Sequence, residues 1–442
     1  MRRFRDLLIF ALCILLALAP MVSANSGPTY WDGTTASGML VTGEDCPIVV
    51  EHENLTFHIS KLPEKGLWDD EKFFDYDDRV TAEYTFYNPT DGDVTVKLLF
   101  PFGVRPVYVP NGMTDFPKYT VTADGQPVET VLRHSLSWDD FDMGKDSARL
   151  HDGFMEHDFY RPDLPVTKYV LHPEGVDWAE YDTVWAKVRL DTDPSRTKYI
   201  VDPGNSFSTE KDHALAGGAL GVRDTAEMYI IGQIPEKSLE WTLFWDDKPI
   251  KGTMELVSTE QMTLMEYILS TRPEGSDASD ADWYNASVQM MDRSECGYGY
   301  LDVIYRLDLM CWYEYVLTIP AGERLVNTVT APLYPDVHSG WDPPIYHYKY
   351  LLSPAKGWAD FGTLDITIRT VYILRECNLD GFEDTGYGYE LHLDGLPEKE
   401  LEFVLCSSAH PDPPGGGAAG MIWFAGILGA VLAVGWVLMK RR

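Results

Sequence analysis

The chain has 442 residues, and its 36 lysine and arginine residues are outnumbered by 69 aspartate and glutamate residues, which gives a net charge of −33. Proteins that bind nucleic acid need a basic surface, so this balance excludes a nucleic-acid partner. Apolar residues make up 45% of the chain and aromatic residues 13%, which is enough for a large folded core despite the acidity.

Two apolar segments lie near the ends of the sequence. Residues 1–24 combine several arginines, an apolar stretch and the small residues Ser23-Ala24, a pattern that predicts a secretory signal peptide. Residues 419–439 carry no charge and are long enough to cross a bilayer as a helix, and the basic residues 440–442 indicate a cytoplasmic end. We therefore expect a plasma-membrane protein with an extracellular ectodomain, a Pro/Gly linker at 409–418 and one C-terminal transmembrane helix.

Strand signals dominate the predicted ectodomain. Apolar and polar residues alternate from 80 to 87 and again from 94 to 100, which is the period of a half-buried strand. Turn-forming residues lie between these segments, so the pattern predicts a hairpin, and a second hairpin is predicted from 119–122 and 128–133. Further strands are predicted at 183–190, 227–232, 239–245, 302–319, 345–352, 363–374, 388–393 and 400–405.

Helix signals are few and lie in the middle of the chain. Ser258 and Gln261 match a capping box, which predicts a helix that runs to about Ser270. A second helix is predicted from Trp283 to Ser294, with Asp282 as its cap.

These elements predict a mainly β fold, an antiparallel β-sandwich type of ectodomain with a short helical insertion, followed by the transmembrane helix. We expect an N-terminal β-rich region at 25–205, a mixed region with helices at 206–300 and a C-terminal β-rich region at 301–408. The number of β domains is left open by the pattern.

The stretch 134–182 lacks a clear period and is rich in aspartate, histidine and aromatic residues. A loop of that length inside a compact domain is usually functional or an insertion, so this stretch is where we expect a site. Its aromatic side chains are candidates for stacking on sugar faces, with core packing as the competing interpretation. They are Trp138, Phe141, Phe154, Phe159, Tyr160 and Trp178.

Oxygen ligands for calcium are clustered at Asp139, Asp140 and Asp142. This segment begins like a calcium loop, but its glycine falls one place early and the closing glutamate is missing. His151 and His157 lie among further acidic residues without the spacing of a transition-metal motif. Solvated acidic loops are the competing interpretation for both groups, and we expect no other cofactor.

No catalytic motif is complete. The chain lacks a Gly-x-Ser-x-Gly elbow, and its two Ser-x-x-Lys matches lack the Lys-Thr-Gly strand that this chemistry requires. We therefore expect a non-enzymatic binding or structural role at the cell envelope, with an envelope protein or a glycan as partner. The alternative is a surface hydrolase that acts on glycans or peptides with carboxylates from 134–182. The oligomeric state stays open.

Five cysteines follow the predicted signal peptide, and an odd number leaves at least one without an intramolecular partner. Cys377 and Cys406 each follow a predicted strand, so they form a disulfide if those strands are neighbours in one sheet. Cys296 and Cys311 are a second candidate pair, which requires the chain to fold back between them. Cys46 is then the unpaired thiol.

Two segments carry a resemblance to known proteins. They are Ala82–Pro89, which leads to Leu98–Gly103, and Tyr350–Trp358, which is followed by Phe361–Ile366. They resemble an uncharacterised bacterial family of membrane-anchored, β-rich ectodomains, and more distantly the vault/inter-alpha-trypsin type of β-sandwich. The resemblance implies a bacterial cell-surface protein, and it implies no catalytic or ligand-binding residue.

Overall fold

The computed structural model describes residues 35–37, 40–42, 46–62, 78–104, 120–137, 143–235, 239–301, 307, 309–333 and 335–413. The predicted signal peptide at 1–24, the transmembrane helix at 419–439 and the basic end at 440–442 lie outside these residues, as does most of the linker. Among the described residues, no helix combines the length and the hydropathy that a membrane span requires.

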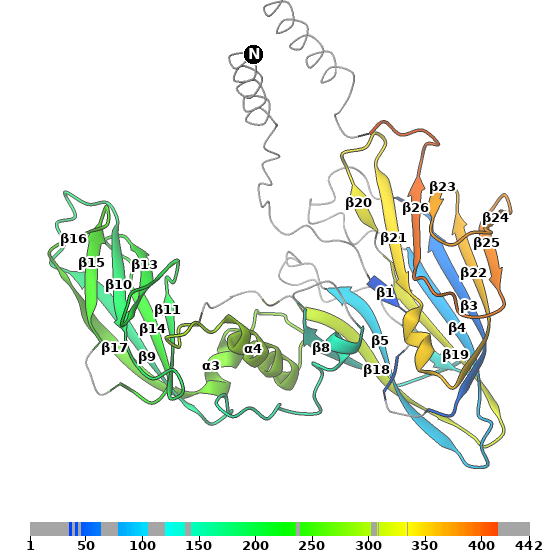
Figure 1. Ribbon diagram of the computed structural model, residues 1–442, viewed down its shortest axis with the longest axis horizontal. Coiled ribbons are helices and arrows are strands. Elements are labelled where there is room, and N and C mark those ends of the chain that lie inside the picture. Colours follow the sequence, from blue (N-terminus) through cyan, green and yellow to red (C-terminus); the bar gives the residue numbers. More distant parts are fainter. Residues whose placement is uncertain are drawn as a thin grey trace, which may run out of the picture. The chain divides into compact units, whose positions relative to one another are not determined.

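The fold is mainly β (Figure 1). The residues that the structure describes form five sheets, and their strand pairings are antiparallel except for β1 with β21 and β3 with β22. The largest sheet has eight strands in the order β24-β25-β22-β3-β4-β19-β6-β7. Their bounds are β3 (Val49–Ile59), β4 (Arg79–Tyr87), β6 (Thr120–Ala123), β7 (Gln126–Pro127), β19 (Arg324–Pro332), β22 (Asp360–Thr370), β24 (Glu383–Asp384) and β25 (Gly388–Leu393).

Two smaller sheets cover one face of this large sheet. One has the order β1-β21-β26-β23 with β20 added to β21, and the other has the order β2-β5-β18-β8. Their strands are β1 (Thr35–Ser37), β20 (Asp336–His338), β21 (Ile345–Leu351), β23 (Ile373–Cys377) and β26 (Leu401–Cys406), then β2 (Leu40–Thr42), β5 (Val94–Val104), β8 (Val131–Leu136) and β18 (Leu309–Ile319).

Aromatic side chains fill the core between these layers. Phe57 of β3 packs edge-on against Tyr350 of β21 and Phe403 of β26, with ring centroids 5.7 and 5.1 Å apart. All three are fully buried, and they belong to one apolar cluster that takes side chains from all three sheets. We call this part of the chain the first sandwich. Burial of such rings is its main source of stability.

A second sandwich is built from the chain between β8 and β18. One of its sheets has the order β11-β14-β9-β17 and the other β12-β13-β10-β15-β16, and Val184, Tyr199 and Met228 lie in the apolar core between them. Its strands are β9 (Pro165–Glu174), β10 (Val184–Leu190), β11 (Thr197–Asp202), β12 (Ser206–Thr209), β13 (Ala214–Leu220), β14 (Ala226–Gly232), β15 (Trp241–Trp245), β16 (Lys248–Pro249) and β17 (Thr253–Thr263). Because β8 and β18 pair with each other, the second sandwich is an insertion into the first.

Helices contribute a third apolar cluster. Helix α3 (Leu264–Ser270) and helix α4 (Asp280–Ser294) pack with Leu136 of β8 and Leu309 of β18, and α3 also lies beside the start of β9. Two short helical turns, α2 (Met143–Ser147) and η2 (Ser353–Gly357), complete the described elements.

The inserted sandwich changes the expected domain organisation. A boundary at 205/206 separates β11 from β12, but the sheets that contain these strands face each other across one core. The expected 25–205 region therefore mixes strands of both sandwiches. The sequence pattern does not reveal which sandwich a strand belongs to, because strands of both sandwiches show the same alternation of apolar and polar residues.

The predicted hairpin at 80–100 is wrong, although both of its strands are present. β4 pairs with β3 and β19, whereas β5 pairs with β18 and β2 in another sheet. The connection crosses the sandwich, where buried Asn88 donates hydrogen bonds to the carbonyls of Gly92 and Ile319. In the second predicted hairpin, β6 folds back onto β7 through the left-handed Asp124-Gly125 turn, but β8 then joins the other sheet.

Both predicted helices end where expected but begin elsewhere. Ser258 and Gln261 lie in strand β17, and the capping box is made five residues later by Thr263 and Glu266. Helix α4 is capped by Ser279, whose hydroxyl accepts a hydrogen bond from the amide of Asp282. Asp282 itself is a buried residue of the first helical turn.

Within the described chain, no disulfide joins the five cysteines to one another. β23 and β26 are neighbours, as the disulfide hypothesis requires, but Cys377 lies opposite Phe403 while Cys406 lies opposite Ile373. Three residues along a strand separate these positions by about 10 Å, which is too far for a disulfide. Cys296 packs at the edge of the second core and Cys311 lies within β18, so the second expected pair is not formed either.

Candidate functional site

The residues predicted as metal ligands do not form a site in the described chain. Asp139, Asp140 and Asp142 lie outside the described residues. His157 Nδ1 accepts hydrogen bonds from the amides of Phe159 and Tyr160 at 3.1 and 3.0 Å, which fixes the local loop. The backbone carbonyl of His151 accepts a hydrogen bond from Arg133 at 2.7 Å. The two histidines therefore serve separate loop contacts.

The aromatic residues of 134–182 mainly fill cores. Phe159 and Tyr160 belong to the helix cluster, and Trp178 packs at the edge of the second sandwich core. Phe154 is about half exposed and packs edge-on against Tyr284. Trp138 and Phe141 lie outside the described residues.

Two of the carboxylates from 134–182, those of Asp146 and Asp152, are paired with basic side chains. Asp146 pairs with Arg149, and Asp152 lies 3.2 Å from the Nζ atom of Lys97. Asp146 is buried and Asp152 is exposed, and each carboxylate has a cation beside it. Lys97 also pairs with Glu314 at 3.0 Å, so Asp152 and Glu314 meet on one cation.

A buried polar cluster lies where β8 meets the segment that opens α4. Cys311 of β18 is directly opposite His134 of β8, and His134 Nε2 lies 3.2 Å from Asp277 Oδ1. This order of thiol, imidazole and carboxylate is typical of a nucleophile with its base and orienting acid. However, Cys311 and His134 are only 1% and 3% exposed, so a substrate has no access to the thiol. The cluster is therefore structural.

Three loops meet at one end of the second sandwich. They connect β9 to β10 (175–183), β13 to β14 (221–225) and β15 to β16 (246–247). Their common position follows from the ladders, because Val184 pairs with Leu220 and Trp185 pairs with Phe244. Loops grouped at one end of a rigid sandwich are a common place for binding residues.

The β15–β16 turn places Trp245 at this end. Asp246 and Asp247 both have left-handed backbone angles, as a two-residue hairpin turn requires, and Trp245 pairs with Lys248 across the turn. Trp245 shares a strand face with Leu243, which is buried in the core, but it lies beyond the end of that core and is 47% exposed.

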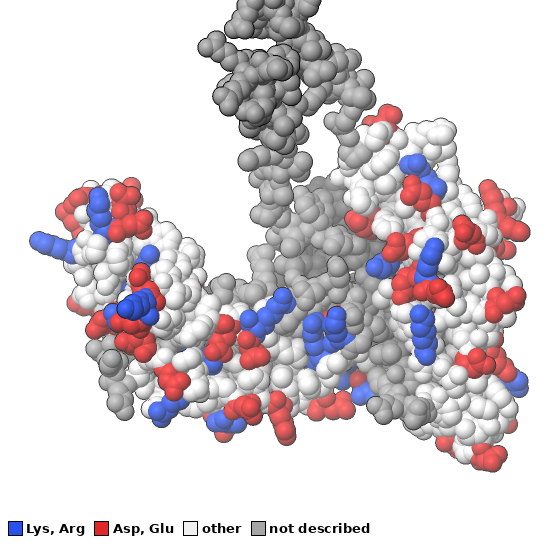
Figure 2. Space-filling view, in the orientation of Figure 1, with Lys and Arg blue, Asp and Glu red and all other residues white. Residues whose placement is uncertain are grey.

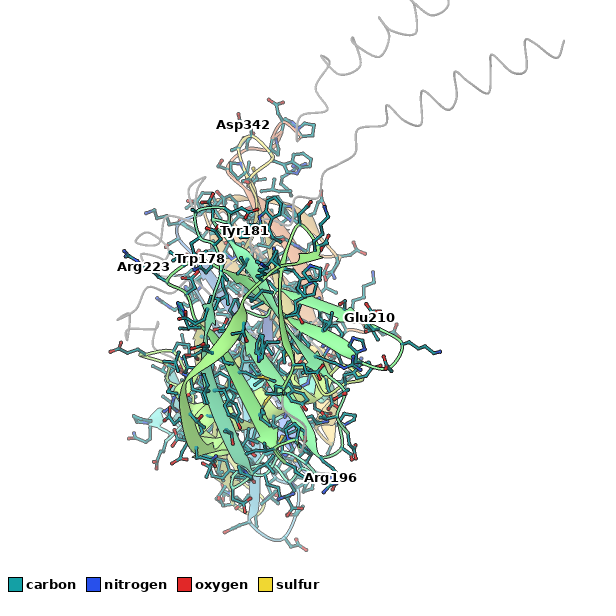
Figure 3. The ribbon with its side chains drawn as sticks, turned by 90° about the vertical axis from the view of Figure 1, so that its left-hand side faces the viewer. Trp178, Tyr181, Arg196, Glu210, Arg223 and Asp342 are labelled. Atoms are coloured by element: carbon teal, nitrogen blue, oxygen red, sulfur yellow. The ribbon has the colours of Figure 1, made fainter. Side chains whose placement is uncertain are left out.

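Tyr181 from the first loop meets Trp245. The two ring centroids are 5.5 Å apart with the ring planes inclined at 47°. A hydrogen bond with Glu180 raises the pKa of Tyr181. The side chains of Trp178 and Tyr181 lie at the same end of the sandwich, and Arg196 lies at the opposite end (Figure 3). We call Trp178, Tyr181 and Trp245, with exposed Val222, the aromatic tip.

Acidic side chains, together with exposed Arg223 and Lys248, lie on and beside the three loops, and charged side chains are visible where β15 and β16 meet (Figure 2). The exposed acidic residues of the three loops are Asp177, Glu180, Asp182, Asp224, Asp246 and Asp247. Some of them support the loops. Asp224 accepts a hydrogen bond from the Gly221 amide at 2.7 Å, and Asp177 accepts one from the Ala179 amide at 3.1 Å. The tip thus combines the exposed ring of Trp245, the half-buried rings of Trp178 and Tyr181, and hydrogen-bond acceptors.

A sequence signal for this tip lies outside the stretch 134–182. Trp245 precedes an Asp-Asp pair at the end of a short strand, and Asp tolerates the left-handed angles of a tight turn. An aromatic residue next to such a turn is placed at a sheet end. Among the described residues, one group also has the spacing of metal ligands: Asp336, His338 and His347 in the first sandwich.

The comparisons with known proteins return little. The chain matches no family model and no curated protein. A crystal structure of a proposed nutrient binding protein from Legionella pneumophila is similar to this chain with a TM-score of 0.35 and 11% identity, over 84% of this chain and 71% of that chain. That likeness is too distant to bear on function. The fold and the site define a mainly β protein with two sandwiches and an exposed aromatic tip.

Proposed function

We propose that this chain is a bacterial single-span surface protein that binds neutral glycans through the aromatic tip, without catalysing a reaction. In this proposal residues 1–24 direct export and residues 419–439 anchor the protein in the plasma membrane. The two sandwiches then lie outside the cell.

The observation that carries the proposal is the Tyr181–Trp245 pair, in which Trp245 is exposed and Tyr181 is half-buried beside it. Two rings that meet between the β9–β10 loop and the end of strand β15 offer apolar faces to a ligand at low cost in conformational entropy. Sugar rings present an apolar C–H face that can lie against such a side chain, and their hydroxyl groups require acceptors at the rim. The carboxylates around the tip supply those acceptors.

The charge around the tip selects among ligand classes. An anionic polymer would place its charges beside the six loop carboxylates, and the protein as a whole carries a net charge of −33. Repulsion between the anionic groups of the polymer and these carboxylates disfavours binding, most strongly at low salt. A neutral glycan avoids this repulsion, so it is the class that the tip fits best.

A panel of insoluble polysaccharides tests the proposal. The full chain in detergent micelles is incubated with neutral and with anionic polysaccharides, and the bound fraction is measured after sedimentation. The proposal expects retention on at least one neutral polysaccharide and loss of that retention in Trp245→Ala. Retention on anionic polymers alone, or equal retention of the variant, would count against it.

A suitable control is the variant Tyr387→Ala. Tyr387 is 90% exposed in the first sandwich, so its replacement removes an exposed ring without changing the tip. The proposal expects this variant to bind like the unmodified chain.

A further inference from the structure

A group of histidine and acidic side chains lies on the outer face of the first sandwich, away from the aromatic tip. Strands β20 and β21 pair so that Asp336 lies opposite His347 and His338 lies opposite Ile345. Alternation along β20 puts Asp336 and His338 on one face, and His347 shares that face as the partner of Asp336. The neighbouring Tyr346 points to the core and is buried.

The ligand atoms of this group lie close together. One donor atom each from Asp336, His338 and His347 lies within 4.8 Å of the others. His338 Nε2 is 3.0 Å from Asp336 Oδ2, and His347 Nε2 is 3.8 Å from Oε2 of Glu402 on β26. Tetrahedral zinc, with bonds of roughly 2.0–2.2 Å, needs donor atoms about 3.4 Å apart. Small rotations of these exposed side chains are enough to bring the donor atoms to that separation.

We propose that Asp336, His338 and His347 bind a divalent transition-metal ion of the zinc type, with Glu402 beside His347 as a further oxygen ligand. Two imidazoles and one or two carboxylates suit zinc, whereas calcium and magnesium prefer oxygen ligands alone. His338 and His347 are 48% and 34% exposed at the side chain, so the ion reaches them without opening the core.

A second histidine–carboxylate group in the same chain shows what a simple ion-pair arrangement is like. On the outer face of the eight-stranded sheet, His392 Nδ1 lies 2.6 Å from Asp365 Oδ1, and His52 Nε2 lies 3.5 Å from Asp365 Oδ2. The two imidazoles approach different oxygens of one carboxylate, and within the described chain this group lacks metal-ligand spacing. This group therefore serves as a matched control for metal binding by Asp336, His338 and His347.

The position of the metal site gives it a structural consequence. The loop between β20 and β21 forms a two-way backbone pairing with the end of the described chain, since Asp342 and Asp412 exchange hydrogen bonds of 3.0 and 2.8 Å. Asp412 lies in the expected linker to the membrane, and Asp342 is labelled in Figure 3. A metal ion that joins β20 to β21 and β26 holds the hairpin to which this segment is bound.

Isothermal titration calorimetry with zinc chloride tests the site on the full chain in micelles, after treatment with a chelator and at pH 7.5. The proposal expects one equivalent of zinc and at least a tenfold weaker affinity in His338→Ala and in His347→Ala. It expects His52→Ala and His392→Ala to bind like the unmodified chain. Zinc should also raise the melting temperature of the unmodified chain and not that of His347→Ala.

Two results would overturn the inference: no stoichiometric binding by the unmodified chain, or equal loss of affinity in the control variants. The metal-free variants must melt at the temperature of the metal-free unmodified chain, which shows that they fold.

A pH titration adds a second check, because imidazole must be neutral to bind the ion. Affinity should fall at least tenfold from pH 7.5 to 5.5 in the unmodified chain. Trp245→Ala should keep full zinc binding, which separates this test from that of the glycan proposal.

Discussion

Arg133 of β8 and Asp282 of α4 form a buried, two-pronged ion pair, with the guanidinium Nη2 and Nε atoms 3.1 and 3.2 Å from Asp282 Oδ1. The second oxygen of Asp282 accepts a hydrogen bond from the His134 amide at 2.9 Å. The adjacent side chains of Arg133 and His134 thus hold two acidic residues, Asp282 and Asp277, of the helical segment. This clamp fastens the helices to the first sandwich.

The first prediction concerns this ion pair. Asp282→Asn removes one of two carboxylates beside the buried guanidinium and leaves Glu314 at 2.8 Å, so the free energy of unfolding should fall by about 1–3 kcal/mol. Urea unfolding followed by circular dichroism measures the change. Asp163→Asn, which removes the partner of exposed Arg161, is the control and should change stability by less than about 0.5 kcal/mol. If both variants changed the free energy of unfolding equally, the Arg133–Asp282 pair would not be a specific source of stability.

The second prediction is a pH dependence from His134. Burial lowers the pKa of His134, but its hydrogen bonds with Asp277 and Cys311 outweigh burial and raise the pKa to about 9. The folded pKa is above the ordinary value of roughly 6.5, so the stabilisation is complete below that pH. It is lost as the pH rises towards 9, and it amounts to about 3 kcal/mol.

Unfolding free energies of Asp277→Asn and of the unmodified chain, measured from pH 6 to pH 9.5, test this dependence. The difference between the two should be largest near pH 6 and should shrink towards pH 9.5. A difference that does not change over this range would contradict a charged His134.

The third prediction concerns Glu53, which is buried in β3 opposite Tyr84. Burial raises the pKa of Glu53 to about 8, although a hydrogen bond with Tyr84 lowers it in part. As the pH rises, Glu53 therefore loses its proton at a lower pH in the unfolded chain than in the folded chain. The stability of the folded state falls for this reason between roughly pH 4.5 and pH 8. Glu53→Gln removes the titration, so the variant should gain stability relative to the unmodified chain as the pH rises to 8.

Denaturant unfolding at pH 5 and pH 8 measures this effect. The gain at pH 8 relative to pH 5 should be about 4 kcal/mol. Glu51→Gln is the control, because a hydrogen bond with Arg324 lowers the pKa of exposed Glu51 and no such gain is expected. An unchanged difference between the two pH values in Glu53→Gln would refute the protonated state.

The fourth prediction separates the two capping boxes. Thr263→Ala removes the side chain that accepts a hydrogen bond from the Glu266 amide, so it should cost about 1 kcal/mol of stability. Ser258→Ala, in exposed strand β17, should change stability by less than about 0.5 kcal/mol. Thermal unfolding of both variants decides which residue begins the helix.

Local structure was predictable from this sequence where a periodic pattern is strong. The alternation at 80–87 gives β4 within one residue, and Ser270 and Ser294 end their helices as expected. The start of α3 was not predictable, because Ser258 and Thr263 are both followed three residues later by a glutamine or glutamate. Burial decides between them, and burial depends on contacts that the local pattern does not contain.

Strand partners and sites were harder to predict. β8 and β18 lie side by side although an entire sandwich separates them in the chain, and alternation does not reveal such a partner. The metal-ligand group had a usable signal, because Asp336-x-His338 follows the period of a strand and His347 lies in the next one. The aromatic tip depends on three loops that only the folded sandwich brings together.

The central claim is that the aromatic tip binds a neutral glycan, and its most direct test is a fluorescence titration. The full chain in micelles is titrated with neutral hexose oligosaccharides, with tryptophan emission and calorimetric heat as readouts. The account predicts saturable binding that Trp245→Ala weakens roughly 30-fold, equivalent to about 2 kcal/mol, and that Tyr387→Ala leaves unchanged. Absence of binding by the unmodified chain, or an affinity that Trp245→Ala does not alter, would contradict it.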